Sequence, residues 1–197
     1  MVNMLLASLL LADIYGNPTL SMSSTYEGER GWISVNSYFY VEDSYGPVGI
    51  PEDGSVTVYE IFYGGDELFE QVTDFDVFMP DTASDDLILT YMDNPLGDLL
   101  YQSYEAPEAA YNLQETSLLS WDWQPGKGLQ GGQTAVLMVF STHSEVEISN
   151  AAFFAQSSTG ALGAGTLGVL VPSMIPAPST LVLMSLPLVL AGRSRKN

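Results

Sequence analysis

The chain of 197 residues carries 24 acidic and 5 basic side chains, a formal net charge of −19, and its hydrophobic content is 46%. Nucleic acid is excluded as a main partner, because binding a phosphate backbone needs a footprint of Lys and Arg. Cysteine is absent, which excludes a disulfide framework, a thiolate zinc site and a thiol nucleophile. The apolar content is sufficient for one folded domain of about 160 residues.

The first segment, residues 1–12, is an apolar run about as long as the hydrophobic region of a signal peptide. Polar, turn-forming residues follow it directly, but the charged start of a signal peptide is missing. We therefore interpret residues 1–12 as a truncated signal peptide, with a first buried strand as the alternative.

Residues 13–160 alternate between apolar and polar side chains in several short stretches that are rich in β-branched and aromatic residues. This pattern predicts eight strands, at residues 32–41, 56–63, 71–78, 87–92, 99–104, 117–124, 133–141 and 146–156, and the same pattern predicts a ninth just beyond them at 166–171. Gly, Pro, Asn and Asp bound these stretches, and no long segment has a helical period. The expected fold is all-β: a single antiparallel β-sandwich or jelly-roll-like domain, acidic in character.

Acidic residues are concentrated in one half of the chain. Residues 31–126 contain 19 carboxylates and no Lys, Arg or His. Because burying unpaired carboxylates is costly, we expect them to form a hydrated acidic surface. The alternative is a calcium site in the loop that carries Asp81, Asp85 and Asp86, since calcium prefers oxygen ligands. No other cofactor is expected.

The aromatic and histidine motifs have plain structural interpretations. Trp121 and Trp123 share one face of a predicted strand, which favours core packing over a sugar-stacking platform. His143 is the single histidine and no nucleophile elbow accompanies it, so we expect a loop residue and no catalytic site.

A stretch of small residues follows the last predicted loop, and we expect residues 161–174 to hold a final strand and a Gly/Pro-rich linker. Within it, Gly163–Gly168 formally matches the dinucleotide fingerprint GxGxxG. The match lacks the strand–helix context of that fingerprint, so linker composition is the better interpretation.

The C-terminal segment, residues 175–197, has three parts in a fixed order. The motif Pro176, Ala177, Pro178 and Ser179 precedes an uncharged apolar run at 181–191, and the basic residues Arg193, Arg195 and Lys196 follow. An apolar run before a basic cluster is typical of a segment whose end is retained in the cytoplasm. Eleven helical residues reach only about 17 Å of a hydrocarbon core of about 30 Å, so this short membrane helix suits a transient anchor.

This order closely resembles the PEP-CTERM sorting signal, in a Pro-Ala-Pro variant in which Ala177 replaces the usual Glu. The resemblance implies a bacterial precursor anchored in the inner membrane, processing by an exosortase-like enzyme, and delivery to the cell surface or the extracellular space. It also implies extracellular polysaccharide as a partner. It covers only residues 175–197 and implies no activity for the domain before them.

The leading hypothesis is therefore an exported, non-enzymatic cell-surface or matrix protein. One alternative is a carbohydrate-binding, lectin-like module, with or without calcium. The other is an exported glycan hydrolase, for which paired carboxylates alone are weak evidence.

Overall fold

A computed structural model describes residues 17–28, 31–41, 54–65, 71–79, 88–91, 108–112, 118–124, 126–157 and 162–173. These residues form strands and no helix, which confirms the all-β prediction for the described part of the chain. In chain order the strands are β1 (Leu20–Gly28), β2 (Gly31–Val41), β3 (Ser55–Gly65), β4 (Gln71–Phe78), β5 (Ile88–Tyr91), β6 (Glu108–Asn112), β7 (Leu118–Asp122), β8 (Leu129–Gln130), β9 (Thr134–Ser141), β10 (Glu145–Gln156) and β11 (Leu162–Ser173).

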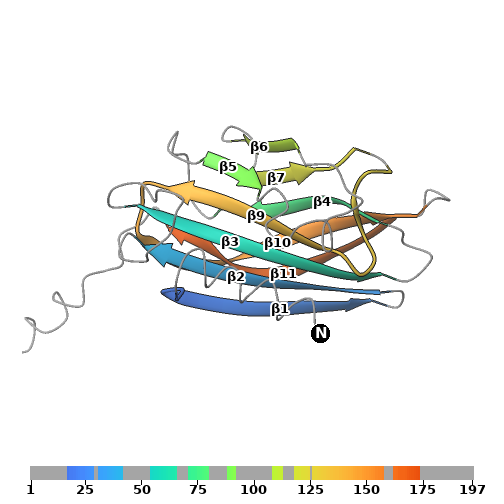
Figure 1. Cartoon of the computed structure of the whole chain (residues 1–197), viewed down its shortest axis with the longest axis horizontal. Coiled ribbons are helices and arrows are strands. Elements are labelled where there is room, and N and C mark those ends of the chain that lie inside the picture. The colour runs from blue at the N-terminus through green and yellow to red at the C-terminus, as the bar shows by residue number, and fades with distance from the viewer. Residues whose placement is uncertain are drawn as a thin grey trace, which may run out of the picture.

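The strands form two antiparallel sheets (Figure 1). Sheet A has the order β1-β2-β3-β9-β5, and sheet B has the order β11-β10-β4-β7-β6, with β8 paired to β4. The chain passes from sheet A to sheet B between β3 and β4, between β5 and β6, and between β9 and β10, and it returns to sheet A between β4 and β5 and between β8 and β9. Every strand pair in the described part of the chain is antiparallel, as the alternating sequence pattern predicts.

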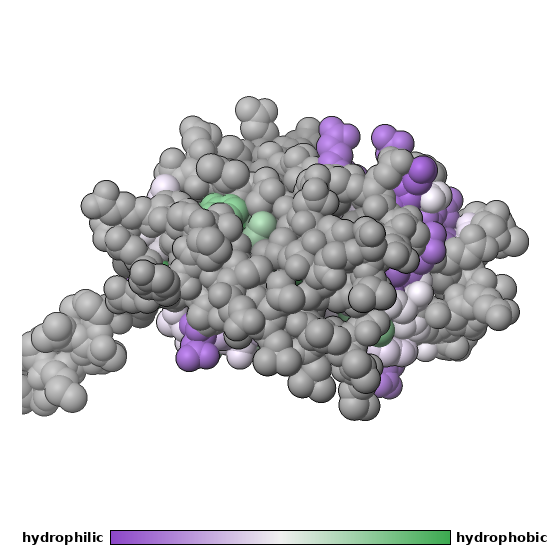
Figure 2. Space-filling model, in the orientation of Figure 1, coloured by the Kyte–Doolittle hydropathy of each residue, from purple (hydrophilic) through white to green (hydrophobic). Residues whose placement is uncertain are grey.

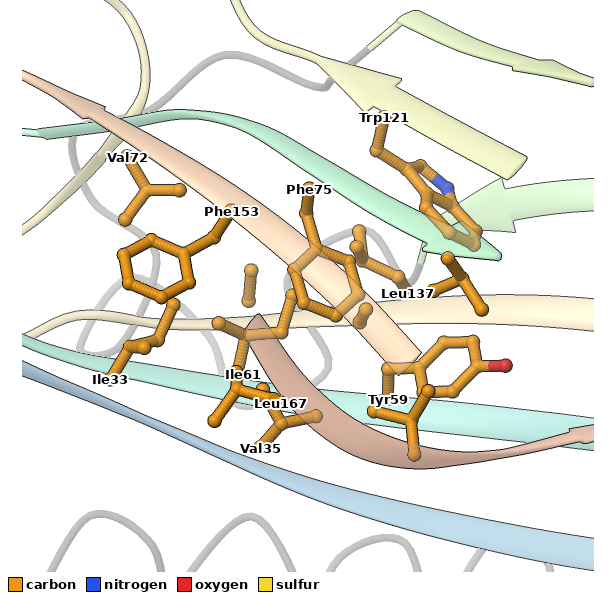
Figure 3. Packing of buried hydrophobic residues seen from close by; sticks show 14 of the residues in the cluster. Ile33, Val35, Tyr59, Ile61, Val72, Phe75, Trp121, Leu137, Phe153 and Leu167 are labelled. Carbon is orange, nitrogen blue, oxygen red and sulfur yellow. The ribbon is translucent and has the colours of Figure 1, made fainter. Parts of the chain in front are cut away.

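One hydrophobic core lies between the sheets and draws side chains from both (Figure 3). Tyr59 of sheet A packs tilted against Phe75 and edge-on against Trp121 of sheet B, with ring centroids 6.1 and 6.0 Å apart. Aromatic pairs favour such offset and edge-on geometries. The core therefore holds the two layers together largely through large aromatic side chains.

The middle strands of sheet A are buried on both faces. All eight residues of β9 are buried, although alternate side chains point away from sheet B. The outer face of sheet A, defined as the face turned away from sheet B, carries buried apolar residues on β3 and β9: Val56, Val58, Phe62, Val136, Met138 and Phe140. Strands with nearly continuous apolar sequence are typical of sheets covered on both sides.

Strand β11 is the edge of sheet B and packs against β1 of sheet A. At Gly165, an added Cβ would lie 2.6 Å from a ring carbon of Phe153 and 2.9 Å from one of Tyr26. At Gly168, it would lie 2.9 Å from the methyl group of Met22. The small residues of this stretch therefore let two strands from different layers approach closely.

The structure corrects several sequence expectations about where strands lie. Residues 162–165, expected in a flexible linker, belong to β11. Strands β1, β6 and β8 were not predicted. The predicted strand at 99–104, the signal-peptide segment 1–12 and the C-terminal helix at 181–191 all lie outside the described residues.

Candidate functional site

The residues predicted to carry sorting lie beyond the last strand. Strand β11 ends at Ser173, and the described residues end with it. Pro176, Ala177, Pro178 and Ser179 therefore lie outside the described residues, as do Arg193, Arg195 and Lys196. The calcium candidates Asp81, Asp85 and Asp86 lie outside them too.

The two tryptophans predicted in the core are there. Trp121 is fully buried and Trp123 nearly so, and both belong to the central cluster. The sugar-stacking alternative for these two residues is therefore wrong, because no face of either indole is open to a ligand. His143 lies in the turn between β9 and β10, where its N–H donates to Ser141 Oγ at 3.0 Å, as expected of a loop residue.

The most unusual polar group is Glu60, on the outer face of sheet A at the centre of β3. Its side chain is 0% exposed, and its Oε2 accepts hydrogen bonds from Asn36 Nδ2 at 2.9 Å and Tyr38 Oη at 3.1 Å. Oε1 has no hydrogen-bond partner among the described residues. Burial raises the pKa of the Glu60 carboxyl, and the two donated bonds oppose part of that rise.

Burial also raises the pKa of the Tyr38 hydroxyl, and the nearby Glu60 carboxylate raises it further. The Tyr38 hydroxyl therefore stays protonated and donates a hydrogen bond to Glu60. Burying the Glu60 carboxyl group lowers the stability of the fold, and its two described partners are only half-buried. Groups with such an unfavourable environment are concentrated at functional sites.

Four residues before Asn36 on β2, Trp32 forms an aromatic platform on the same outer face. Its indole stacks on Phe62, with ring centroids 5.0 Å apart and planes 30° apart. It lies across Gly64, where an added Cβ would come within 2.3 Å of the indole. The side chain remains 38% exposed, so it is held by the sheet and still reaches solvent.

The outer face of sheet B has a different character, because it carries a row of carboxylates. Asp74 of β4 lies opposite Asp122 of β7, and Asp122 lies opposite Glu108 of β6. Asp76 accepts a hydrogen bond from Ser120. Partial burial, followed by the charges of Asp74 and Asp76, raises the pKa of Asp122 to about 6. This row repels anions and is part of the acidic surface that the composition predicts.

Among the described residues, no group of three or more His, Asp or Glu side chains is arranged to hold a metal ion. Within the same part of the chain, no helix is long and apolar enough to cross a membrane.

No protein-family model matches this chain, and no curated protein matches it either.

Glu60, Asn36 and Trp32 were not predicted as site residues. A signal for Glu60 was present, because it is the one charged residue in a strand that is apolar on both faces (Ser55–Gly65). A lone carboxylate in such a strand must be buried and hydrogen-bonded. Asn36 and Trp32 carry no comparable signal, since their role depends on the register of β2 against β3.

Proposed function

We propose that this chain is an exported bacterial cell-surface or extracellular-matrix protein whose domain is non-catalytic and whose C-terminal tail directs sorting. In this proposal the two sheets form a β-sandwich of the jelly-roll kind. The tail anchors the precursor in the inner membrane until an exosortase-like enzyme cuts it near Pro176 to Ser179. The mature domain is then released or attached outside the cell.

One observation carries the proposal: the last strand ends at Ser173, three residues before Pro176. Every strand pair among the described residues lies before that point. A cut in the Pro-Ala-Pro motif would therefore remove the apolar run and the basic end and leave all of the described strands intact. A processed sorting signal requires this separation between the folded domain and the removable tail.

The basic end gives the proposal a physical mechanism. Arg193, Arg195 and Lys196 are costly to bring across a bilayer, so they hold the end of the tail in the cytoplasm. The apolar run before them is too short for a stable span, which suits a segment that is retained only until it is cut.

Changing Arg193, Arg195 and Lys196 together to Ser tests this mechanism. The variant should pass into the medium unprocessed, whereas the parent protein is retained and cut. The matched control changes the other two basic residues, Arg30 and Lys127, to Ser, and should leave retention unchanged. If the triple variant fractionates like the parent protein, the basic end does not direct retention.

A carbohydrate-binding module is the second candidate function. Trp121 and Trp123 do not support it, since both are buried, but the exposed indole of Trp32 does. No observation among the described residues favours a glycan hydrolase.

A further inference from the structure

The platform around Trp32 is rigid before any ligand arrives. Phe62 packs against the indole and the backbone at Gly64 lies beneath it. A side chain that is already fixed loses little conformational entropy on binding. Trp32 is also the one exposed tryptophan of the chain, since Trp121 and Trp123 are in the core.

Hydrogen-bonding side chains continue from this platform along β2. Because alternate residues of a strand share a face, Trp32, Asn36 and Tyr38 project from the outer face of sheet A. Four residues of strand place Asn36 about 14 Å from Trp32. On the neighbouring strand β1, Thr25 lies opposite Ser34 and Ser23 lies opposite Asn36, and both β1 residues are exposed. The row therefore combines one aromatic ring with hydroxyl and amide groups.

Glu60 fixes the middle of this row. It accepts one N–H of Asn36 and the hydroxyl proton of Tyr38. Asn36 also hydrogen-bonds the Tyr38 hydroxyl, so Glu60 and this bond together fix the orientation of both half-buried groups. Burying a carboxylate lowers the stability of the fold, and its role in orienting two half-buried polar groups explains why it is buried here.

The outer faces of both sheets carry carboxylates. Beside the row along β2 they are the buried Glu60 and Glu27 of β1, which is exposed and lies opposite Trp32, whereas the outer face of sheet B carries Asp74, Asp76 and Asp122. A row without Lys or Arg cannot pair with phosphate, sulfate or carboxylate groups. The hydrophilic and hydrophobic side chains of one face are shown in Figure 2, where hydrophobic atoms of the coloured residues appear only in small patches.

We propose that the outer face of sheet A along β2 binds a neutral oligosaccharide or polysaccharide chain, with a sugar ring stacked on Trp32 and hydroxyl groups bonded to Asn36 and Tyr38. The apolar C–H face of a sugar fits an aromatic ring, and its hydroxyl groups both donate and accept, as the amide and phenol groups require. This proposal deepens the second candidate function and rests on it. It does not depend on how the tail is processed, so its failure would leave the sorting proposal untouched.

The test measures binding of the full chain to cellohexaose, xylohexaose and mannohexaose by calorimetry, together with acrylamide quenching of tryptophan fluorescence. We expect at least one hexasaccharide to bind and to protect the exposed indole from quenching. Trp32→Ala should weaken that binding at least about tenfold, because truncating an aromatic anchor at the centre of a contact costs most of its affinity. The matched control is Phe154→Ala on the outer face of sheet B, where the side chain is 39% exposed, and it should bind as the parent does.

Asn36→Ala and the conservative Trp32→Phe are the second set of variants. Asn36→Ala should weaken binding several-fold, and Trp32→Phe should retain part of it, so the proposal is decided even if Trp32→Ala fails to fold. The proposal is overturned if none of the three hexasaccharides binds. It is equally overturned if binding survives in both Trp32→Ala and Asn36→Ala, or if Phe154→Ala abolishes it.

Discussion

Tyr59 of sheet A donates its hydroxyl proton to the backbone carbonyl of Leu170 at the edge of sheet B, at 2.8 Å. The N–H of the same Leu170 donates to Ser37 Oγ of sheet A at 3.1 Å. Both backbone groups of this residue that face away from β10 are thus satisfied by side chains of the other layer. The free edge of β11 is closed here by the opposite sheet, which limits pairing with other chains.

Tyr59→Phe should lower the free energy of unfolding by about 1–2 kcal/mol, because the Leu170 carbonyl would be left buried without its donor. Urea denaturation of the full chain measures this change. The control is Tyr26→Phe, since the Tyr26 hydroxyl has no hydrogen-bond partner among the described residues, and it should change stability by less than about 0.5 kcal/mol. Equal losses in both variants would mean that the Tyr59 bond does not join the layers.

Gly165→Ala should destabilise the protein by about 1–3 kcal/mol, because the new methyl group would collide with the rings of Phe153 and Tyr26. A thermal melt measures the effect. Ala164→Ser, at the exposed neighbouring position, is the control and should melt close to the parent. A parent-like melt for Gly165→Ala would show that residues 162–165 are a loose linker after all.

The strands of highest apolar content could be predicted from the sequence, and the rest could not. The bounds of β4, Gln71–Phe78, match the predicted strand because Val72, Phe75 and Val77 alternate with polar residues in nearly regular order. Strand β1 was missed because a Ser-rich stretch resembles a loop until β2 pairs with it. The Glu60 site was missed for the same reason. It forms only when the register of β2 against β3 brings Asn36 and Tyr38 to Glu60, and the sequence of one strand does not encode that register.

Glu60→Gln should make stability less dependent on pH. Burial raises the pKa of the Glu60 carboxyl in the folded state above its unfolded value. Stability from this group is therefore fully present below the unfolded pKa and is lost as the pH rises through the folded one. Gln removes the penalty of ionising a buried group, so the variant should gain stability over the parent at pH 8 and gain less at pH 4.

Denaturation curves of both proteins at pH 4, 6 and 8 measure the difference. Tyr38 and Asn36 donate to the same carboxyl oxygen in the parent and can donate to the amide oxygen of Gln, so the fold should persist. A variant that loses more stability at pH 8 than at pH 4 would show that ionised Glu60 stabilises the domain.

Asp122→Asn should likewise stabilise the protein most at high pH, because the pKa of Asp122 is raised to about 6 in the folded state. Below its unfolded pKa, near 4, the group carries no penalty; as the pH rises through about 6, it ionises beside Asp74 and Asp76, and stability is lost. Asp122 is exposed, so solvent and salt screen the effect and it should amount to a small rise in melting temperature. Sodium chloride should raise the melting temperature of the parent at pH 8 and raise that of the variant less. An equal response to salt would mean that this carboxylate row does not strain the fold.

The central claim is that a folded two-sheet domain ends before a tail that is removed during export. Intact-mass spectrometry of the mature protein, recovered from the cell surface or the medium of its native host, tests this claim most directly. We predict a chain that ends between Pro176 and Ser179 and keeps all of β11 through Ser173. Mature extracellular protein that still ends at Asn197 would contradict the claim.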